Sequence, residues 1–486
     1  MSKILFSHSY YYQLDPKQWK NKNPFPPLGT LYAASLLREN SFSVDLFDTN
    51  LLAHPKAIEK KLQELAPDYL VIYDDGFNYL TKMCLSNMRE ACFEMIEIGK
   101  KHQCQIIVCS SDATDHYENY LDKGADFIIR GEGEITLLEL IKQLEKKEDV
   151  TTISGIVFKN NNEILLTPER TVLQNLDELP LPAWDLVDIE AYRKIWEKSK
   201  QPFTLNIATT RGCPFKCNWC AKPIYGNRYN AHSPEYIVNQ IAYLKGNFNV
   251  SRFWMCDDIF GLKPNWVQEF KTLLKKENLP IRYFIQSRVD LLIKEDTIAC
   301  LAESGLEEVW VGAESGSQKI LDAMDKGITV NQIYQTTHLL KQKSVKVAFF
   351  LQFGFLNETR EDIQKTIKMV KELKPDNIGI SISYPLPGTK FYETVKDDLK
   401  LKANWTDSDD FEMMFQGTYT SKFYRKLQRL VHKEYRKAKG FEAILKITKN
   451  PNQLAVTNVI SALKLIYYIP SVWYNSKSLK KLEREN

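Results

Sequence analysis

Arg211–Cys220, which reads RGCPFKCNWC, is the stretch of this chain that decides its fold. It sets Cys213, Cys217 and Cys220 at a C-x3-C-x2-C spacing, and thiolates this close in sequence are typical of metal ligands. A structural zinc site needs four protein ligands, whereas an iron–sulfur cubane can be held by three cysteines with one iron left open. No fourth Cys or His lies nearby in the sequence. The spacing therefore favours a cluster, and a zinc site or a chance group of buried thiols are the alternatives.

This spacing, with Trp219 before the third cysteine, resembles the signature of the radical S-adenosylmethionine (SAM) superfamily. The resemblance implies a [4Fe–4S] cluster whose open iron binds the amino and carboxylate groups of SAM. It also implies a 5′-deoxyadenosyl radical, formed when one electron cleaves the sulfonium, and a reductant of the flavodoxin or ferredoxin type. The cofactor carries the difficult chemistry in such enzymes, and the protein positions and shields it.

The composition is that of an ordinary globular protein of two to three domains, with 486 residues, 44% of them hydrophobic and 26% charged. The start, MSKILFSHSYYY, has no apolar signal core and is predicted to be a first strand. Outside the triplet, six cysteines lie in apolar contexts: Cys84, Cys92, Cys104, Cys109, Cys256 and Cys300. They fit a reducing compartment, so a cytoplasmic protein is predicted. The net charge of +4 is too small to indicate a nucleic acid partner.

Residues 1–150 alternate short apolar runs with helical patterns, which predicts a doubly wound α/β sheet. The predicted strands are Lys3–Ser7, Ser43–Asp48, Tyr69–Tyr73, Gln105–Cys109 and Asp126–Arg130. The predicted helices are Gly29–Asn40, Pro55–Leu65, Leu85–His102 and Ile135–Lys147. A ligand of such a sheet lies over the carboxyl ends of the strands, which here carry Ser7–Gln13, Tyr73–Asn78, Ser110–Thr114 and Gly131–Glu134.

The end of this unit, residues 110–140, is similar to the closing segment of the cobalamin-binding domain that precedes many radical SAM domains, most clearly in its turn RGEGE. The resemblance implies a Rossmann-like domain with these cobalamin contacts: Tyr73, Asp74, Gly76, Ser110, Ser111, Thr114, Gly131 and Glu132. Ser110, Ser111 and Asp112 stand where the family has a Gly-Gly-Pro-His-like turn. The signature D-x-H-x-x-G is missing and His8 does not supply it, so no histidine is expected on cobalt. A domain that only packs, without cobalamin, is the alternative.

Residues 151–200 are predicted to be a connector between two domains. Ile153–Phe158 and Glu163–Thr167 flank Asn160–Asn162, which is a β-hairpin pattern. Pro180 and Pro182 then break regular structure and mark a domain boundary. The sequence LPLPAWD around them resembles the linker between the two domains of the same family.

Residues 201–395 repeat a strand and a helix six times, which predicts three quarters of a β/α barrel. The predicted strands are Thr204–Thr210, Arg252–Asp257, Arg282–Arg288, Glu308–Glu314, Val345–Gly354 and Asn377–Tyr384. Chemistry in barrels collects at the carboxyl ends of the strands. The cysteine loop follows the first of these strands.

Four further segments resemble strand-end motifs of cobalamin-dependent radical SAM enzymes: FWMCDDIF, VGAESGS, QFGFLNETRED and YPLPGTKFYE. In the third, Gly354 and Glu358 match the family turn while Leu356 and Asn357 do not. The SAM contacts that the resemblance and the charge of SAM imply are Trp219, Asp257, Asp258, Arg288, Glu314, Ser315 and Gly354. Carboxylates suit the sulfonium and ammonium of SAM, and arginine suits its carboxylate. For the three acidic residues a helix cap or an ion pair is the alternative.

Residues 396–486 are predicted to be helical. Lys422–Lys449 holds ten Lys or Arg against two Glu, with apolar residues at helical spacing. Such a helix can lie on an anionic membrane or contact nucleic acid, although a solvated face over an apolar stripe is the commoner use. Val459–Tyr474 is apolar but too short, and broken by Pro470, to span a bilayer. A lid, a docking surface and peripheral membrane contact are the roles left open.

Together these features predict a cobalamin-dependent radical SAM enzyme, a methyltransferase that acts on an unactivated carbon of a small-molecule or lipid-like substrate. A cyclase or rearrangement enzyme like the anaerobic magnesium-protoporphyrin cyclase is the main alternative, and an iron–sulfur redox sensor is the alternative outside enzymes. Methylthiolation of tRNA is not favoured, because neither extra cluster-binding cysteines nor a terminal β-barrel is present. No catalytic residue is assigned, and the loop Pro223–His232, expected near the substrate, matches no known pattern.

Overall fold

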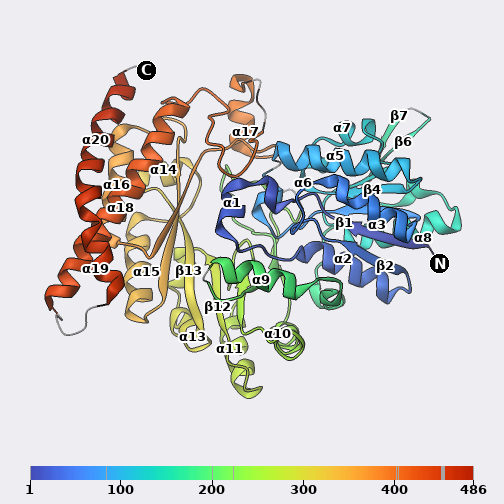
Figure 1. Cartoon of the computed structure of the whole chain (residues 1–486), viewed down its shortest axis with the longest axis horizontal. Coiled ribbons are helices and arrows are strands. Elements are labelled where there is room, and N and C mark those ends of the chain that lie inside the picture. Colours follow the sequence, from blue (N-terminus) through green and yellow to red (C-terminus); the bar gives the residue numbers. More distant parts are fainter. Residues whose placement is uncertain are drawn as a thin grey trace. The chain divides into compact units, whose positions relative to one another are not determined.

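The computed structural model describes residues 2–83, 85–161, 163–199, 201–222, 224–400, 402, 404–449 and 455–484. Cys84, Asn162 and Pro223, which belong to predicted features, lie outside these residues. The chain divides into two compact units (Figure 1). Unit 1 comprises Met1–Phe215, Ala221–Ile285 and Asn404–Asp410. Unit 2 comprises Lys216–Cys220, Gln286–Ala403 and Phe411–Asn486.

Unit 1 begins with a seven-stranded sheet in the order β2-β1-β3-β4-β5-β6-β7. Its strands are β1 (Lys3–Ser7), β2 (Ser43–Phe47), β3 (Tyr69–Tyr73), β4 (Gln105–Cys109), β5 (Phe127–Ile129), β6 (Ile156–Asn160) and β7 (Glu163–Leu166). The first five are parallel, as predicted. The hairpin predicted as a connector instead adds two antiparallel strands to the β5 edge, because its apolar residues Ile156, Val157 and Phe158 are buried there.

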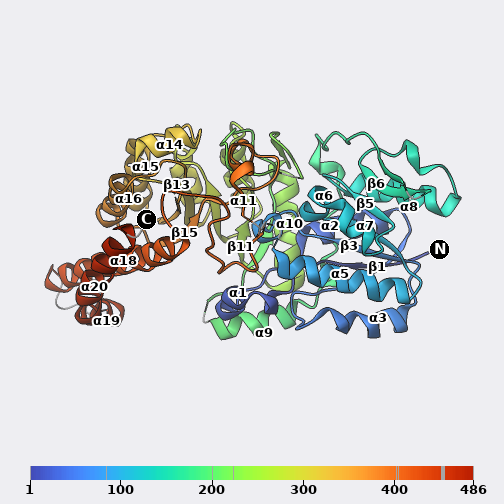
Figure 2. The same cartoon turned by 90° about the horizontal axis from the view of Figure 1, so that it is seen from above.

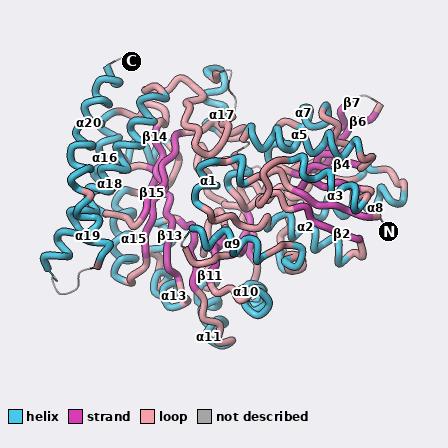
Figure 3. The backbone as a smooth tube through the Cα atoms, in the orientation of Figure 1, coloured by secondary structure: helices cyan, strands magenta, loops and turns pink. Residues whose placement is uncertain are grey.

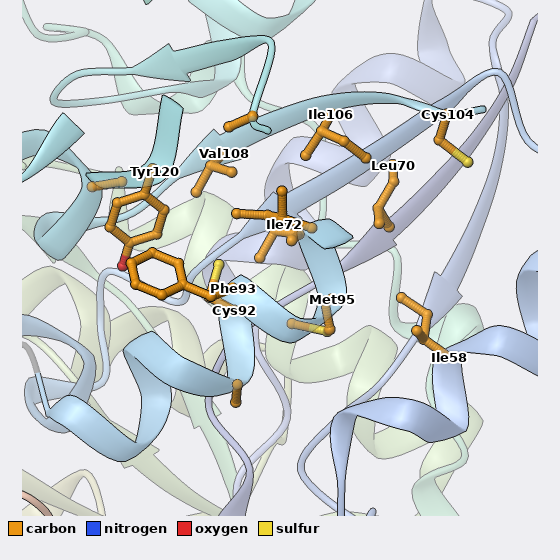
Figure 4. Close-up of a cluster of buried hydrophobic side chains, with 14 of the residues drawn as sticks. Ile58, Leu70, Ile72, Cys92, Phe93, Met95, Cys104, Ile106, Val108 and Tyr120 are labelled. Carbon is orange, nitrogen blue, oxygen red and sulfur yellow. The ribbon is translucent and has the colours of Figure 1, made fainter. Parts of the chain in front are cut away.

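Helices cover both faces of this sheet, as in a doubly wound fold. The helices of unit 1 are α1 (Pro16–Asn21), α2 (Leu28–Glu39), α3 (Ile58–Leu65), α4 (Tyr79–Lys82), α5 (Ser86–Lys101), α6 (Ser111–Asp115), α7 (Tyr117–Asp122), α8 (Glu134–Lys146), α9 (Ile189–Ser199), α10 (Pro234–Phe248) and α11 (Trp266–Lys276). Helix α2 packs beside α8, and α3 beside α5 (Figure 2). In Figure 4, Ile58 and Met95 from the helices meet Leu70, Ile72 and Ile106 from the strands in one buried cluster.

Unit 1 also holds the first strands of the predicted barrel. These are β8 (Leu205–Ile207), β11 (Arg252–Met255) and most of β12 (Arg282–Ser287), which belongs to unit 1 up to Ile285; the three are parallel with β11 in the middle. The strand predicted for Thr204–Thr210 ends early, because the N–H groups of Thr209 and Thr210 donate to the carboxylate of Asp257. The chain then forms a separate two-stranded sheet from β9 (Thr210–Arg211) and β10 (Asn230–Ala231).

Unit 2 holds the other barrel strands, β13 (Leu306–Glu314), β14 (Lys346–Phe353) and β15 (Asn377–Ile382), which are parallel in that order. Its helices are α12 (Val289–Leu292), α13 (Thr297–Glu303), α14 (Gln318–Ala323), α15 (Val330–Gln342), α16 (Arg360–Leu373), α17 (Lys390–Val395), α18 (Ser421–Lys449), α19 (Val456–Leu463) and α20 (Leu465–Arg484). All six predicted strands therefore occur, with shifted ends. The predicted α/β fold with parallel sheets and a helical C-terminal region is confirmed.

The three C-terminal helices pack against one another within unit 2 (Figure 3). Helix α18 contacts α16, α19 and α20, and at Gly440 an added Cβ would lie 2.7 Å from the side chain of Leu465. The predicted break at Pro470 is wrong, since α20 runs through it. Burial of Leu465, Val472 and Leu479 on one side of α20 offsets the lost backbone hydrogen bond. Among the described helices, none has the length and apolar character needed to cross a membrane.

Candidate functional site

The cysteine loop begins at a turn that only glycine fits. Gly212 has a φ of 78°, and an added Cβ would lie 2.4 Å from the carbonyl oxygen of Arg228. The pairing of Arg211 with Asn230 ties both ends of the loop together. Glycine is therefore required here for two reasons, its positive φ and the close approach of a second backbone segment.

Cys213 belongs to unit 1, whereas Cys217 and Cys220 belong to unit 2. All three are partly exposed, while the other described cysteines are buried. The triplet cysteines can therefore be reached from solvent by a metal, whereas the other described cysteines pack in the interior. No group of three or more His, Cys, Asp or Glu within the described ranges is arranged to hold a metal ion. Ligation by the triplet therefore stays a prediction.

Within unit 2, two cations lie near Cys217. Arg288 Nη1 is 3.9 Å from Cys217 Sγ, and Asp290 holds the same guanidinium through a bond of 2.9 Å to Arg288 Nε. Lys326 Nζ is buried 2.8 Å from Glu314 Oε1 and lies 5.7 Å from the centre of the Trp219 ring. Burial alone would lower the pKa of Lys326, but the carboxylate of Glu314 and the thiol of Cys217 raise it. Two positive charges therefore lie near the thiol of Cys217.

The sequence alone predicts no role for Lys326. It stands alone in the turn after α14, and nothing in a single sequence distinguishes it from any other surface lysine. Lys326 is buried against Glu314, the last residue of β13. Glu314 has a φ of 51°, which is not a strand conformation, so its side chain does not follow the alternating pattern of the strand. The predicted contact Ser315 lies next to it and shares a hydrogen bond of 3.1 Å with Thr366.

Gly354 and Glu358 form a tight turn after β14. Gly354 has a φ of 78°, and its N–H donates to Glu358 Oε2 over 2.7 Å. An added Cβ at Gly354 would lie 3.2 Å from both Met413 Sδ and the Tyr424 ring. Glu358 is fully buried, its Oε1 has no hydrogen-bond partner, and burial raises its pKa to about 8. This turn therefore holds a half-satisfied carboxyl, that is, a buried carboxyl of which one oxygen accepts a hydrogen bond and the other has no partner.

In unit 1, Asp257 is a local cap of the backbone. Its carboxylate accepts from Thr209 N at 2.6 Å, Thr209 Oγ1 at 2.5 Å and Thr210 N at 2.8 Å. Burial raises the pKa of Asp257 to about 7, and these hydrogen bonds oppose the rise. Asp258 is exposed and pairs with Lys82 over 2.6 Å. The cap and the ion pair are the alternatives that the sequence left open for these two residues.

Arg211 lies at the centre of a closed ion cluster in unit 1. Its guanidinium is 2.5 Å from Glu132 Oε1 and 2.8 Å from Glu134 Oε1, both in the RGEGE turn. The rings of Tyr32, Phe77 and Tyr225 surround it at 5.4, 5.5 and 5.3 Å. Arg211 opens the cysteine stretch, but the sequence alone predicts no role for it. The cluster joins the turn after β5 to the strand that leads into the cysteine loop.

The residues predicted to contact cobalamin lie at the carboxyl ends of β3, β4 and β5. Asp74 accepts from Ser9, Ser110 caps α6, Thr114 donates to the Ser110 carbonyl, and Glu132 is paired with Arg211. Among the predicted cobalamin contacts, all of which the structure describes, Ser111 on α6 is the one with a buried hydroxyl that has no hydrogen-bond partner.

Two glycines line this edge of the sheet. At Gly76 an added Cβ would lie 2.7 Å from Ile224 Cδ1, and at Gly131 the nearest atom is the Ile224 carbonyl oxygen at 3.6 Å. The segment Ile224–Tyr225 therefore lies against both glycines, and cobalamin binding at this edge stays a prediction. His8 lies 3.0 Å from Asp48 and bonds to Thr49, so its ring is committed within the fold.

Cavity volume does not single out the carboxyl ends of β3, β4 and β5. A concave surface of about 560 Å³ along α5, lined by Asn87, Phe93 and Glu94 among others, shares no residue with the predicted cobalamin contacts. A smaller cavity of about 240 Å³ includes Glu132, Arg170 and Leu173. The chemistry of the strand ends is the better guide, because a cofactor edge can be covered by a loop such as Ile224–Tyr225.

Comparison with known proteins gives a family match for the part of the chain that holds the cysteine loop. Residues 207–370 match the Radical SAM superfamily. The match begins in β8 and ends in α16, so it includes the cysteine loop, Arg288, Glu314 and Gly354. The resemblance carried by the sequence motifs is thereby confirmed.

Similar proteins extend the likeness to about four fifths of the chain. The "uncharacterized methyltransferase PH0819" of Pyrococcus horikoshii is 29% identical over 78% of this chain and 81% of its own length. The anaerobic magnesium-protoporphyrin IX monomethyl ester cyclase of Rubrivivax gelatinosus is 25% identical over 82% of this chain and 71% of its own.

A solved structure shares the fold. It is the cobalamin-dependent S-adenosylmethionine radical enzyme OxsB with aqua-cobalamin and S-adenosylmethionine bound, which aligns with a TM-score of 0.71. The alignment covers 99% of this chain and 72% of that chain, at 18% sequence identity. At this identity the likeness establishes the fold, including both units and the C-terminal helices.

Proposed function

We propose that this chain is a cobalamin-dependent radical SAM methyltransferase that acts on an unactivated carbon of a small-molecule substrate. The observation that carries the proposal is the placement of Arg288 and Lys326 beside Cys217, within the part of the chain that matches the Radical SAM superfamily. When bound, a [4Fe–4S] cluster with SAM supplies a 5′-deoxyadenosyl radical, and methylcobalamin supplies the methyl group.

We propose that Cys213, Cys217 and Cys220 hold the cluster and that Trp219, Asp257, Asp258, Arg288, Glu314, Ser315 and Gly354 form the SAM site. Several of these act through their partners. Asp257 fixes the backbone of Thr209 and Thr210 at the start of the loop. Glu314 keeps the buried ammonium of Lys326 in place, so that Lys326 and Arg288 attract the SAM carboxylate.

We propose that cobalamin binds over the strand ends of unit 1 through Tyr73, Asp74, Gly76, Ser110, Ser111, Thr114, Gly131 and Glu132. The hydroxyl of Ser111 would gain the hydrogen bond that it lacks, which favours a polar group of the ligand at that point. No histidine is assigned to cobalt, since His8 is held by Asp48 and Thr49. We propose that cobalamin is bound base-off and without a nitrogen ligand from the protein, so cobalt(II) in the bound cofactor should give an electron paramagnetic resonance spectrum without axial nitrogen splitting.

A second candidate function is a cyclase or rearrangement reaction, favoured by the similarity to the magnesium-protoporphyrin cyclase. Methyl transfer is preferred because the relative named a methyltransferase is more identical, at 29% against 25%. Methyl transfer consumes one SAM for the methyl group and one for the radical. Conversion of the true substrate should thus yield S-adenosylhomocysteine and 5′-deoxyadenosine in about equal amounts, whereas a cyclase would yield no S-adenosylhomocysteine.

The first test needs no substrate. Anaerobically reconstituted protein with SAM and dithionite should release 5′-deoxyadenosine, measured by liquid chromatography and mass spectrometry. An iron–sulfur redox sensor would not release it, so a negative result with a full cluster would favour that alternative. We further propose a reductant of the flavodoxin or ferredoxin type in the cytoplasm and peripheral membrane contact through the C-terminal helices.

A further inference from the structure

The C-terminal helices of unit 2 expose an unusual amount of apolar surface. Of the thirteen large hydrophobic side chains that are exposed among the described residues, eleven lie between Phe441 and Tyr474. Isolated exposed apolar residues are common in proteins, but a contiguous set marks an interaction surface. We define the C-terminal apolar face by six members: Val456, Ile460, Leu463, Ile466, Ile469 and Trp473.

Helix α20 has two apolar sides, and only one is used in packing. Leu465, Val472 and Leu479 are buried and recur every seven residues. Ile466 and Trp473 keep the same seven-residue spacing one position later, yet they are 80% and 60% exposed. The second side is therefore not required by the fold of unit 2, and its exposure carries a free-energy cost in water.

The helices that carry this face are strongly basic. Residues 421–484 hold fifteen Lys or Arg and three Glu, although the whole chain has a formal net charge of only +4. The remainder of the chain is consequently acidic on balance. Between Val456 and Tyr474 the only charged residue is Lys464. An apolar stripe within a basic region is the pattern of helices that lie in a membrane interface.

Lysines also pair with the exposed aromatic rings at this surface. Lys477 Nζ lies 3.8 Å from the centre of the Trp473 ring, Lys426 Nζ lies 5.1 Å from that of Tyr474, and Lys433 Nζ lies 5.7 Å from that of Tyr467. The lysine stems thus run along rings that are themselves open to solvent. Trp and Tyr with neighbouring Lys are enriched where a protein meets lipid headgroups, because their apolar bodies enter the interface and their polar ends stay in water.

We propose that α18, α19 and α20 bind the surface of an anionic lipid bilayer, with the C-terminal apolar face entering the headgroup region and the surrounding lysines and arginines contacting lipid phosphates. A second copy of this chain is disfavoured as the occupant, since a symmetric contact would bring two such basic surfaces together. Nucleic acid is disfavoured because Ile466, Ile469 and Leu463 offer aliphatic groups where phosphate contacts need donors. This inference deepens the peripheral contact proposed above and does not depend on the cluster chemistry.

Co-sedimentation with vesicles tests the proposal on the full-length protein. Vesicles of phosphatidylcholine with phosphatidylglycerol should pellet the protein, vesicles of phosphatidylcholine alone should bind it much less, and added NaCl should release it. The double substitution Ile466→Ser and Trp473→Ser should weaken binding to the anionic vesicles by on the order of tenfold or more, since two large side chains no longer enter the interface.

The matched control is Tyr79→Ser with Leu166→Ser, which removes two exposed apolar side chains of unit 1 and should leave vesicle binding unchanged. Circular dichroism should be unaltered in both double variants, because all four residues are exposed. Light scattering should report a monomer for the wild-type protein. Failure to bind anionic vesicles, or a dimer that the Ile466/Trp473 variant abolishes, would overturn the proposal. Release of 5′-deoxyadenosine is measured separately, so either proposal can fail without the other.

Discussion

Two buried clusters differ in the groups that surround their arginine and lysine side chains. In unit 1, Arg211 has two carboxylate partners, Glu132 and Glu134, and three aromatic rings around it. In unit 2, Arg288 bonds to Asp290 and Lys326 bonds to Glu314, and both cations lie near the thiol of Cys217. We call the first cluster closed, because two carboxylates enclose one cation, and the second open, because its cations also lie beside a thiol.

The difference separates a structural role from a binding role. A buried ion cluster whose carboxylates outnumber its cation attracts no further anion, and breaking it leaves uncompensated charge. A cluster whose cations lie beside a thiol can also attract a further anion such as a carboxylate. We therefore expect variants of the Arg211 cluster to lose stability and variants of the Arg288 and Lys326 cluster to lose chemistry.

The largest effect is expected at the cysteine triplet. Changing Cys213, Cys217 or Cys220 to Ala should abolish both the charge-transfer absorbance of a reconstituted cluster and the release of 5′-deoxyadenosine, because three ligands leave no redundancy. Cys256→Ala is the matched control, since Cys256 is buried and its Sγ lies 3.3 Å from the Ile207 carbonyl oxygen. A triplet variant with full cluster content and activity would contradict the assignment.

The next largest effect is expected from opening the closed cluster. Arg211→Met should lower the free energy of unfolding by roughly 3–5 kcal/mol, because Glu132 and Glu134 are left buried without their partner. Urea denaturation followed by circular dichroism measures this loss. Adding Glu132→Gln and Glu134→Gln to the same protein should recover most of it. If the single variant is as stable as the wild type, the cluster is not a structural element.

A smaller effect, on chemistry, is expected at the open cluster. Lys326→Met should reduce the rate of SAM cleavage by on the order of tenfold to a hundredfold, as expected for the loss of one charged contact. The single variant also leaves Glu314 unpaired, so Lys326→Met with Glu314→Gln is the informative protein. Its stability should return toward that of the wild type while cleavage stays slow. Recovery of both together would assign Lys326 a purely structural role.

Much of the fold follows from local patterns in the chain. Strands β1, β3 and β4 occur within the predicted bounds, since each is a short apolar run between turn residues. The predicted end of a strand is wrong where a side chain takes the backbone N–H groups that would otherwise bond to the neighbouring strand. The strand predicted to reach Thr210 stops at Ile207, because Asp257, distant in sequence, takes the N–H groups of Thr209 and Thr210.

The site was only partly predictable for the same reason. Cysteine spacing is a local signal, so the triplet could be singled out from the sequence alone. The partners of Arg211 and Glu314 come from turns 77 and 12 residues away, and no periodicity links them. Pro470 shows the converse error, since tertiary packing of α20 on α18 overrides a local helix breaker.

The smallest predicted effect concerns the half-satisfied carboxyl of Glu358, whose pKa burial raises to about 8. Between the ordinary pKa of a glutamate and about pH 8, the folded protein keeps a proton that the unfolded chain has lost. The free energy of unfolding should therefore fall as pH rises through this window, by at most about 1.4 kcal/mol per pH unit from this one group. Glu358→Gln still accepts from Gly354 N–H but cannot ionise, so its stability should fall less steeply from pH 5 to pH 8.

Asp362 is the matched control for this measurement. Its side chain accepts from Ser317 and Thr359, and although burial opposes the change, these hydrogen bonds lower its pKa to about 2. The stability that Asp362 contributes is thus fully present above its ordinary pKa and is lost only as pH falls toward 2. Asp362→Asn should lower stability across pH 5 to 8 without changing the slope. Urea denaturation at each pH gives both slopes, and an unchanged slope in Glu358→Gln would show that the unpartnered Oε1 is reached by water and that Glu358 ionises normally.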